Sequence, residues 1–339
     1  MTKPYMNKTK MELLAKEGAF SDMYQMLKQL GFVYEKKEQL MLPYYNLIKQ
    51  NWCRLQEKNG CLIHITNISQ PHEKLATCSS WRSSMNNWYI QHGIANQIRL
   101  FLYAISCECN WLAEQISTKY IQCWFQTQNA IMNKVCNLVK TRQNEGNYFS
   151  EVLYYLSWTP MEMEVNKQWH TSSYTTNQQK ELKDFIIQQK GLLYYYGEEI
   201  ESDPFFALIN RQYQEIGLER SRDILMVYKG NWLKAVILRY KGPQGINFSF
   251  LENRIEIIVD TASKSESELF HAIGNAIHEM GELQGFSPIV VNHVFSDMLE
   301  SVGAQKLRLY TRFLLTKTAI RSWISVLTEK YSLSNWNNE

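Results

Sequence analysis

The chain has 339 residues, a formal net charge of +3 and a hydrophobic share of 45%. This length is ample for two cores, and the small charge excess lacks the basic cluster of a dedicated nucleic-acid surface. No apolar run is long enough to span a membrane, and the basic N-terminus leads into no apolar signal segment. The seven cysteines form no CxxC pair, which favours reduced thiols and no metal site. We therefore expect a cytoplasmic protein without a membrane partner.

The first half begins with a helical region. Residues 9–50 carry apolar side chains at three- and four-residue intervals, which predicts helices. Further on, apolar and alternating patterns predict strands at 60–68, 86–91, 119–126 and 147–158, and helices at 94–117 and 129–142. The polar stretch 159–180 reads as a junction.

The second half repeats this alternation of helices and strands. The patterns predict a helix at 177–191, two strands within 222–242, a strand at 253–260, a helix at 265–285, a strand at 287–292, a helix at 293–303, a strand at 305–317 and a final helix at 318–331. Ser265 and Glu268 have the spacing of a capping box for the helix at 265–285.

The two halves share one order of elements. Residues 86–158 and residues 253–317 both predict β-α-β-α-β, which indicates an internal repeat and an α/β fold with a mixed sheet. We expect an N-terminal helical segment at 1–50, a first domain at 51–160, a second domain at 177–320 and a C-terminal helix and tail at 321–339.

The end of the second half resembles a known superfamily. Val290 and Val291 are followed by Asn292, and "MLESVGA" (298–304) places Gly303 eleven residues after that Asn. These residues resemble the closing unit of the GNAT superfamily of N-acetyltransferases, although Leu299 stands in place of the family's Tyr and Ala304 in place of its Phe. The hairpin within 222–242 and the strand at 253–260 resemble the family's central strands.

The resemblance implies tandem GNAT-like domains that bind acetyl-CoA or another acyl-CoA. In this superfamily a splayed strand pair binds the pantetheine arm, and a glycine-containing loop presents backbone N–H groups to the pyrophosphate. The resemblance therefore implies cofactor contacts in the second half from Ile258, Val259, Ser263, Lys264 and Asn292. The loop "TASKSESEL" (261–269) departs from the family, because it has no glycine and carries two Glu residues where an anion would bind.

The first half has a closer match to the cofactor loop. In "IQHGIAN" (90–96), Gly93 and Ala95 occupy the family's two small-residue positions, while Ile90 replaces the leading Gln or Arg. The resemblance implies cofactor contacts from Gly93, Ile94, Ala95 and Arg99. Equally, Gly93 could simply form a tight turn between a strand and a helix.

One carboxylate is the candidate catalytic group. Glu252 precedes the strand at 253–260, where an amine acceptor would meet the thioester, so it could act as the general base; a surface turn at Glu252–Arg254 is the alternative. We therefore expect an acyl-CoA-dependent N-acyltransferase acting on a small-molecule or protein amine. The alternative is a catalytically silent protein of the same fold that holds a small ligand or a protein partner.

Overall fold

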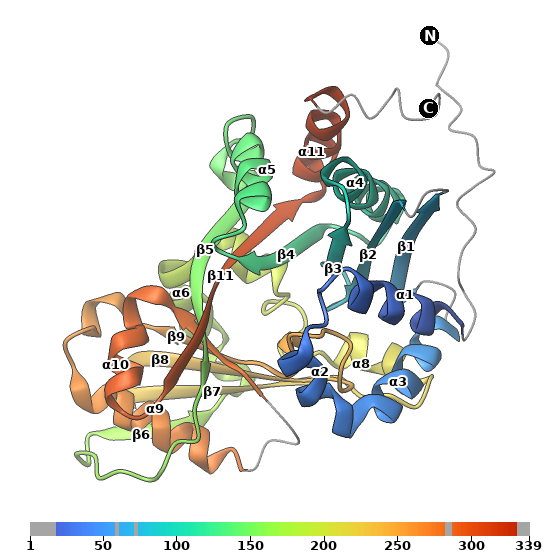
Figure 1. Ribbon diagram of the computed structural model, residues 1–339. Helices are drawn as coiled ribbons and strands as arrows, with labels where there is room; N and C mark the ends of the chain where they lie inside the picture. The colour runs from blue at the N-terminus through green and yellow to red at the C-terminus, as the bar shows by residue number, and fades with distance from the viewer. Residues whose placement is uncertain (1–17, 58–60, 71–73, 282–286, 331–339) are drawn as a thin grey trace.

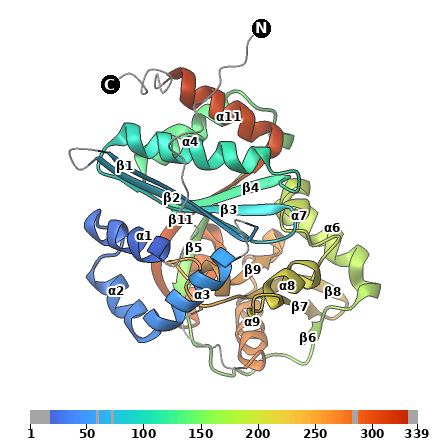
Figure 2. The ribbon, with the colours of Figure 1, turned by 90° about the vertical axis from the view of Figure 1, so that its right-hand side faces the viewer.

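The protein is built on one large mixed sheet (Figure 1). The computed structural model describes residues 18–57, 61–70, 74–281 and 287–330, and in them one 11-stranded sheet has the order β1-β2-β3-β4-β11-β5-β10-β9-β8-β7-β6. Helices cover both faces of this sheet (Figure 2). The predicted α/β fold with a mixed sheet is confirmed.

The first half supplies five strands and five helices of the described chain. Three helices come first, and then three antiparallel strands lead through a crossover helix to a parallel strand. The elements are α1 (Gly18–Gln29), α2 (Glu35–Met41), α3 (Tyr45–Glu57), β1 (Ile63–Gln70), β2 (Lys74–Arg82), β3 (Asn87–Ala95), α4 (Ile98–Glu114), β4 (Tyr120–Gln126), α5 (Ala130–Lys140) and β5 (Tyr148–Ser157).

The second half repeats the same topology after an added edge strand and three helices. Its antiparallel strands β7, β8 and β9 lead through α9 to the parallel strand β10, and α10 then leads to β11. The elements are β6 (Trp169–Ser173), α6 (Gln179–Lys190), α7 (Leu192–Gly197), α8 (Ala207–Gln214), β7 (Ser221–Lys229), β8 (Trp232–Lys241), β9 (Ile255–Val259), α9 (Ser267–Glu279), β10 (Ile289–Asn292), α10 (Ser296–Ser301), β11 (Gln305–Thr316) and α11 (Lys317–Lys330).

The two halves exchange their final strands. In the first half β4 and β5 are not neighbours, because β11 of the second half lies between them. In the second half β10 and β11 are likewise separated by β5 of the first half. The two exchanged strands pair antiparallel with each other at the centre of the sheet. Each half therefore completes its sheet with a strand that the other half supplies.

The apolar cores follow the same division. One cluster packs α4, α5 and α11 on the first half, and a second packs α9 and α10 on the second half. The third takes α1, α3, α6, α7 and α8, together with strand residues of both halves, such as Trp81, Tyr89, Val236 and Leu238. The halves thus share one core on the face opposite α4 and α9.

Two strands, the helices α7 and α8, and one helix start differ from the sequence prediction. The strand β2 was not predicted, because its central Ser79 and Ser80 are polar although both are buried. The short edge strand β6 lies in the stretch that reads as a junction. The helix α9 begins at Ser267 after Glu266, without a capping side chain, so the predicted capping box is wrong; the Glu268 carboxylate instead accepts a hydrogen bond from Trp169 Nε1 at 3.0 Å.

The division into domains stays a prediction. The predicted β-α-β-α-β order is present in both halves, and the predicted helical region lies in α1–α3 as far as the described residues reach. The sheet, however, runs without interruption from β1 to β6 through the exchanged strands.

Candidate functional site

The first candidate site lies where the parallel strands β3 and β4 part. Their pairing runs over Asn87–Ile90 and Tyr120–Cys123, whereas β3 continues to Ala95 and β4 to Gln126. The peptide groups on the facing edges beyond Ile90 and Cys123 are therefore free of that ladder. A splayed parallel pair of this kind is the feature that the resemblance implied for the cofactor.

A β-bulge lies on the same part of β3. Ser79 pairs with Gln91 and Thr77 pairs with Ile94, so two residues of β3, His92 and Gly93, lie opposite one residue of β2. His92 has a positive φ of 53°. A bulge bends a strand and redirects its side chains, which places Gly93 close to α4: a Cβ built on it would lie 3.2 Å from Phe101 Cε2.

The opening between the strands contains a cavity of about 660 Å³, which we call the sheet-opening cavity. Its helix end is lined by the start of α4 and the start of α5. Both helices point their N-termini, the positive ends of their dipoles, toward this end. The lining here includes Gly93, Ile94 and Ala95, with Asn96, Gln97, Ile98, Asn129 and Met132.

Helices α1, α2 and α3 pack on the face of the sheet opposite α4 (Figure 2). The part of the cavity that α2 and its neighbours line is called its far end. It is lined by the segment after α1, by a loop of the second half and by the exchanged strand β11. The residues are Phe32, Tyr34, Lys37, Asn247, Ser249, Arg308 and Tyr310. The cavity therefore passes through the sheet and joins elements of both halves.

His92 fixes the geometry of the cavity wall. Its ring is 3% exposed, and Nε2 accepts the backbone N–H of Phe248 at 3.1 Å. Nδ1 must then carry the proton, which it donates to Ser79 Oγ at 3.0 Å. Burial, and secondarily the nearby Lys37 charge, hold the pKa of His92 well below its ordinary value. His92 is thus a neutral structural group that ties the bulge to the second-half loop.

Three of the four first-half residues that were predicted to contact the cofactor line this cavity. Gly93, Ile94 and Ala95 line it, but Arg99 lies exposed on α4 outside the lining. The roles of all four residues in cofactor binding stay predictions.

The second-half candidates occupy a different environment. Ile258 and Val259 are buried in separate apolar clusters. Ser263 is buried, donates to Asp260 Oδ2 at 2.9 Å and accepts from Lys234 Nζ at 2.8 Å, while Lys264 is exposed. Asn292 ends β10, and its side chain accepts the backbone N–H of Val294 at 3.2 Å. These residues do not line the sheet-opening cavity, and their predicted cofactor contacts remain untested.

Glu252 is fully buried and lies outside the cavity lining. Its Oε1 accepts the backbone N–H of Gly245 at 2.7 Å, so the surface-turn alternative is wrong. Burial raises the pKa of Glu252 to about 8, although hydrogen bonds from nearby backbone groups oppose that shift. The carboxyl is therefore largely protonated at neutral pH, and its role as a base stays a prediction.

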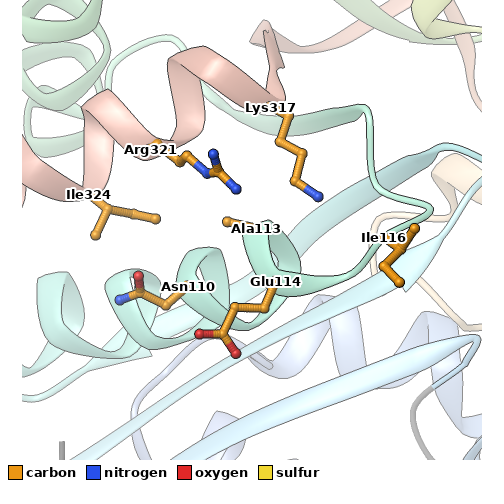
Figure 3. Close-up of a pocket in the computed structure, with 7 residues that line it drawn as sticks. All are labelled: Asn110, Ala113, Glu114, Ile116, Lys317, Arg321 and Ile324. Carbon is orange, nitrogen blue, oxygen red and sulfur yellow. The ribbon is translucent and has the colours of Figure 1, made fainter. Parts of the chain in front are cut away.

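A second hollow lies between α4 and α11 (Figure 3). Its volume is about 630 Å³, and its lining residues are Asn110, Ala113, Glu114, Ile116, Lys317, Arg321 and Ile324. Lys317 Nζ donates to the carbonyl of Gln115 at 2.6 Å, and Ile116 is 99% exposed. This hollow is remote from the strand opening and has no buried polar group of its own among the described residues, so we assign no site to it.

Two features are absent from the described residues. No helix among them combines the length and apolarity that crossing a bilayer requires. In the same part of the chain, no three His, Cys, Asp or Glu side chains gather as a metal site.

Comparisons with known proteins give similarity at the level of structure. No family model and no curated protein matches the chain. A Drosophila protein from a structural genomics programme matches over 87% of this chain and 96% of its own, with 12% identity and a TM-score of 0.42. A GCN5-related N-acetyltransferase from Sphaerobacter thermophilus covers 75% and 80%, with 8% identity and a TM-score of 0.40. A tandem GNAT protein from the clavulanic acid biosynthesis pathway covers 79% and 88%, with 6% identity and a TM-score of 0.37.

The α/β fold of two halves with similar topology, which the sequence predicted, is confirmed, and the solved structures to which it is similar include GNAT proteins. Both halves have three antiparallel strands, a crossover helix, a parallel strand, a helix and a final strand, and the last five elements of each half follow the β-α-β-α-β order that the sequence predicted. This is a likeness of fold alone, and it assigns no substrate and no catalytic residue.

Sequence reasoning missed the far end of the cavity. Lys37 stands in a run of charged residues at 35–38, Arg308 lies far away in the chain, and no known motif surrounds either. Only the exchange of β11 brings Arg308 beside a first-half cavity. The regular alternation of β11 predicted the strand but carried no information about which half it joins.

Proposed function

We propose that the protein transfers an acyl group from acyl-CoA to an amine, with the acyl-CoA bound in the sheet-opening cavity. The observation that carries the proposal is the opening between β3 and β4, which holds a cavity of about 660 Å³. This volume lies in the usual range for small-molecule sites.

From its helix end to its far end, the cavity offers groups suited to the successive parts of an acyl-CoA molecule. The N-termini of α4 and α5 supply backbone N–H groups and positive dipole ends suited to phosphate. The free edge of β3 from Gln91 to Ala95 supplies peptide groups for the amide-containing arm. The thioester would then lie at the opening itself, with its carbonyl polarised by a strand N–H.

The reaction is a simple exchange at the thioester carbonyl carbon. The amine nitrogen forms a bond to that carbon, the carbon–sulfur bond breaks, and the proton lost by the amine ends on the departing thiol. The far end of the cavity leaves space for the amine on the face opposite α4.

Glu252 would need a rearrangement to accept the amine proton. Its neighbour Leu251 lines the cavity, but Glu252 itself does not. A pKa of about 8 suits a general base near neutral pH, so Glu252 serves this role only if substrate binding opens the loop at Asn247–Leu251.

The test is calorimetric titration of acetyl-CoA and CoA. Gly93→Trp fills the cavity beside α4, and Gly146→Trp is the matched control, because a Cβ at Gly146 meets no atom within 4 Å. We expect micromolar to millimolar binding that Gly93→Trp abolishes and Gly146→Trp retains, with thermal melts confirming that both variants fold. No binding to the wild type at millimolar ligand would refute the proposal.

A second candidate function is a catalytically silent binding protein. It is favoured by the cavity lining, because none of the described lining residues is Asp or Glu, so the lining offers no carboxylate base. Binding of acetyl-CoA without acyl transfer to any amine in a broad panel would select this alternative.

A further inference from the structure

Lys37 is a buried cation without a counter-ion. It lies on α2 and is only 8% exposed, yet it lines the far end of the cavity. Its Nζ lies 3.9 Å from the centroid of the Phe32 ring and 5.9 Å from that of Tyr34. No carboxylate of the described residues lies within ion-pairing distance of it.

A second cation reaches the same place from the other half of the chain. Arg308, on the exchanged strand β11, is half-buried and lines the same end of the cavity. Its guanidinium carbon lies 5.2 Å from the centroid of Tyr34. Lys37 and Arg308 therefore flank one aromatic ring, and no carboxylate of the described chain forms an ion pair with either.

The remaining lining does not neutralise these charges. Among the described residues that line the cavity, none is acidic, and His92 beside Lys37 is held neutral. The side-chain amide of Gln91 is already used: it donates to the carbonyl of Ile246 and accepts from Asn247. Ser249 and Tyr310, which carry hydroxyl groups, line the same end.

Such an arrangement has an energetic cost that a ligand could remove. A desolvated ammonium without a partner is unfavourable, and burial accordingly lowers the pKa of Lys37 to about 8. With that pKa, Lys37 is protonated in most molecules at pH 7. An anion entering between the two cations would pair with both and restore the protonated state.

We propose that the far end of the cavity binds an anionic group, a carboxylate or phosphate, of the acyl acceptor, between Lys37 and Arg308. The inference rests on the proposed function and specifies its second substrate: an amine that also carries an anion. The helix end and the far end lie on opposite faces of the sheet, so this anion is distinct from the phosphates of acyl-CoA.

The anion site is tested first without any CoA. Benzoate is titrated by calorimetry into the wild type, Lys37→Met and Arg308→Met, with neutral benzamide as the ligand control. Lys36→Met is the matched protein control, because Lys36 is the exposed neighbour on the same helix. We expect benzoate affinity to fall at least tenfold in each cavity variant, to change less than twofold in Lys36→Met, and to exceed benzamide affinity at least tenfold.

Equal binding of benzoate and benzamide, or unchanged benzoate affinity in Lys37→Met, would overturn the proposal. Lysine labelling gives a readout that does not depend on affinity. Trinitrobenzenesulfonate should modify Lys37 near pH 8, as mapped by mass spectrometry, and benzoate should protect it. Thermal melts show whether the variants are folded; if Lys37→Met does not fold, protection of Lys37 in the wild type decides the matter.

Acetyl-CoA titrations separate the two possible sources of the anion. Lys37→Met should keep its affinity for acetyl-CoA within threefold, whereas a tenfold loss would assign the cations to a CoA phosphate and overturn the proposal. If wild-type protein binds benzoate through Lys37 but does not bind acetyl-CoA, the anion site stands and the acyltransferase function fails.

Turnover provides the final comparison. With acetyl-CoA, 4-(aminomethyl)benzoate should be acylated with a kcat/KM at least tenfold above that of benzylamine. This preference should disappear in Lys37→Met through an increase in KM with little change in kcat, since the lost interaction is a binding one. Equal use of the two amines by the wild type would contradict the inference.

Discussion

Replacing Arg312 should lower the free energy of unfolding by an amount that the buried charges around it explain. It lies on β11, directly opposite Glu151 on β5, and is fully buried. Its guanidinium contacts the carboxylates of Glu151 and Glu256, and Glu198 lies 3.8 Å away. With Lys190 and Arg254, the described part of this cluster has three cations and three carboxylates, so its formal charge is zero.

Arg312→Met leaves one buried carboxylate uncompensated. Breaking a buried ion pair by removing one partner costs about 3–5 kcal/mol, much of it the desolvation of the charge that remains. The pKa of Glu256, which the Arg312 charge chiefly lowers against the opposing effect of burial, should also rise. The stability that the wild type gains from this lowered pKa is fully present above the unfolded pKa of 4.5 and is lost as pH falls through the folded pKa of about 2. The variant should therefore lose less stability in acid than the wild type does.

The measurement is urea denaturation followed by circular dichroism, with Lys28→Met as a control. Lys28 forms an exposed ion pair with Glu38 at 2.6 Å, and its loss should cost less than about 1 kcal/mol. Adding Glu256→Gln to Arg312→Met restores the charge balance and leaves the buried ion pair between Glu151 and Lys190 intact. The double variant should therefore be at least as stable as Arg312→Met alone. A cost below 1 kcal/mol for Arg312→Met, or simple additivity of the two substitutions, would refute this reasoning.

Two other substitutions test the loop beside the cavity. Glu252→Gln keeps the acceptor for Gly245 but removes a carboxyl whose pKa burial raises from 4.5 to about 8. The free energy of unfolding of the wild type should therefore fall as pH rises from 4.5 to about 8, and the variant should gain about 4 kcal/mol on it across that window, as measured by urea melts. Loss of acyl transfer in this folded variant would support Glu252 as the base. Gly245→Ala should cost about 1–3 kcal/mol more than Gly303→Ala, since both positions have positive φ but only a Cβ at Gly245 collides with Ile48, at 2.4 Å. Equal losses for the two alanine variants in thermal melts would show that Ile48 relaxes freely.

The sequence predicted the elements with strong periodicity better than their arrangement. The alternating strands of the hairpin within 222–242 and the long strand at 305–317 were predicted almost to the residue. The strand β2 was missed because its buried serines find partners far away in the sequence: Ser80 donates to Glu108 and Ser79 contacts His92. Local patterns also carry no information on strand register, so the exchange of β5 and β11 could not be predicted.

The candidate site was predicted in part for the same reason. Gly93 and Ala95 form a local pattern of small residues that the sequence reveals, and both line the cavity, although they lie in the strand β3 and not in the predicted loop or turn. Glu252 appeared to precede a strand at the surface, whereas folding buries it completely against Gly245. The far end depends on tertiary contacts between distant segments, which no spacing in the sequence encodes.

The exchange of final strands also constrains how the molecule is made and inherited. During synthesis the edge of β4 leaves the ribosome long before β11 exists to cover it, and an uncovered strand edge invites pairing with other chains. The first half must therefore be kept from aggregating until β11 arrives. For the same reason, a gene rearrangement that separated the halves would leave each half with an uncovered strand edge. Natural selection therefore acts on the two halves as a single unit, even if only one of them retains a functional ligand site.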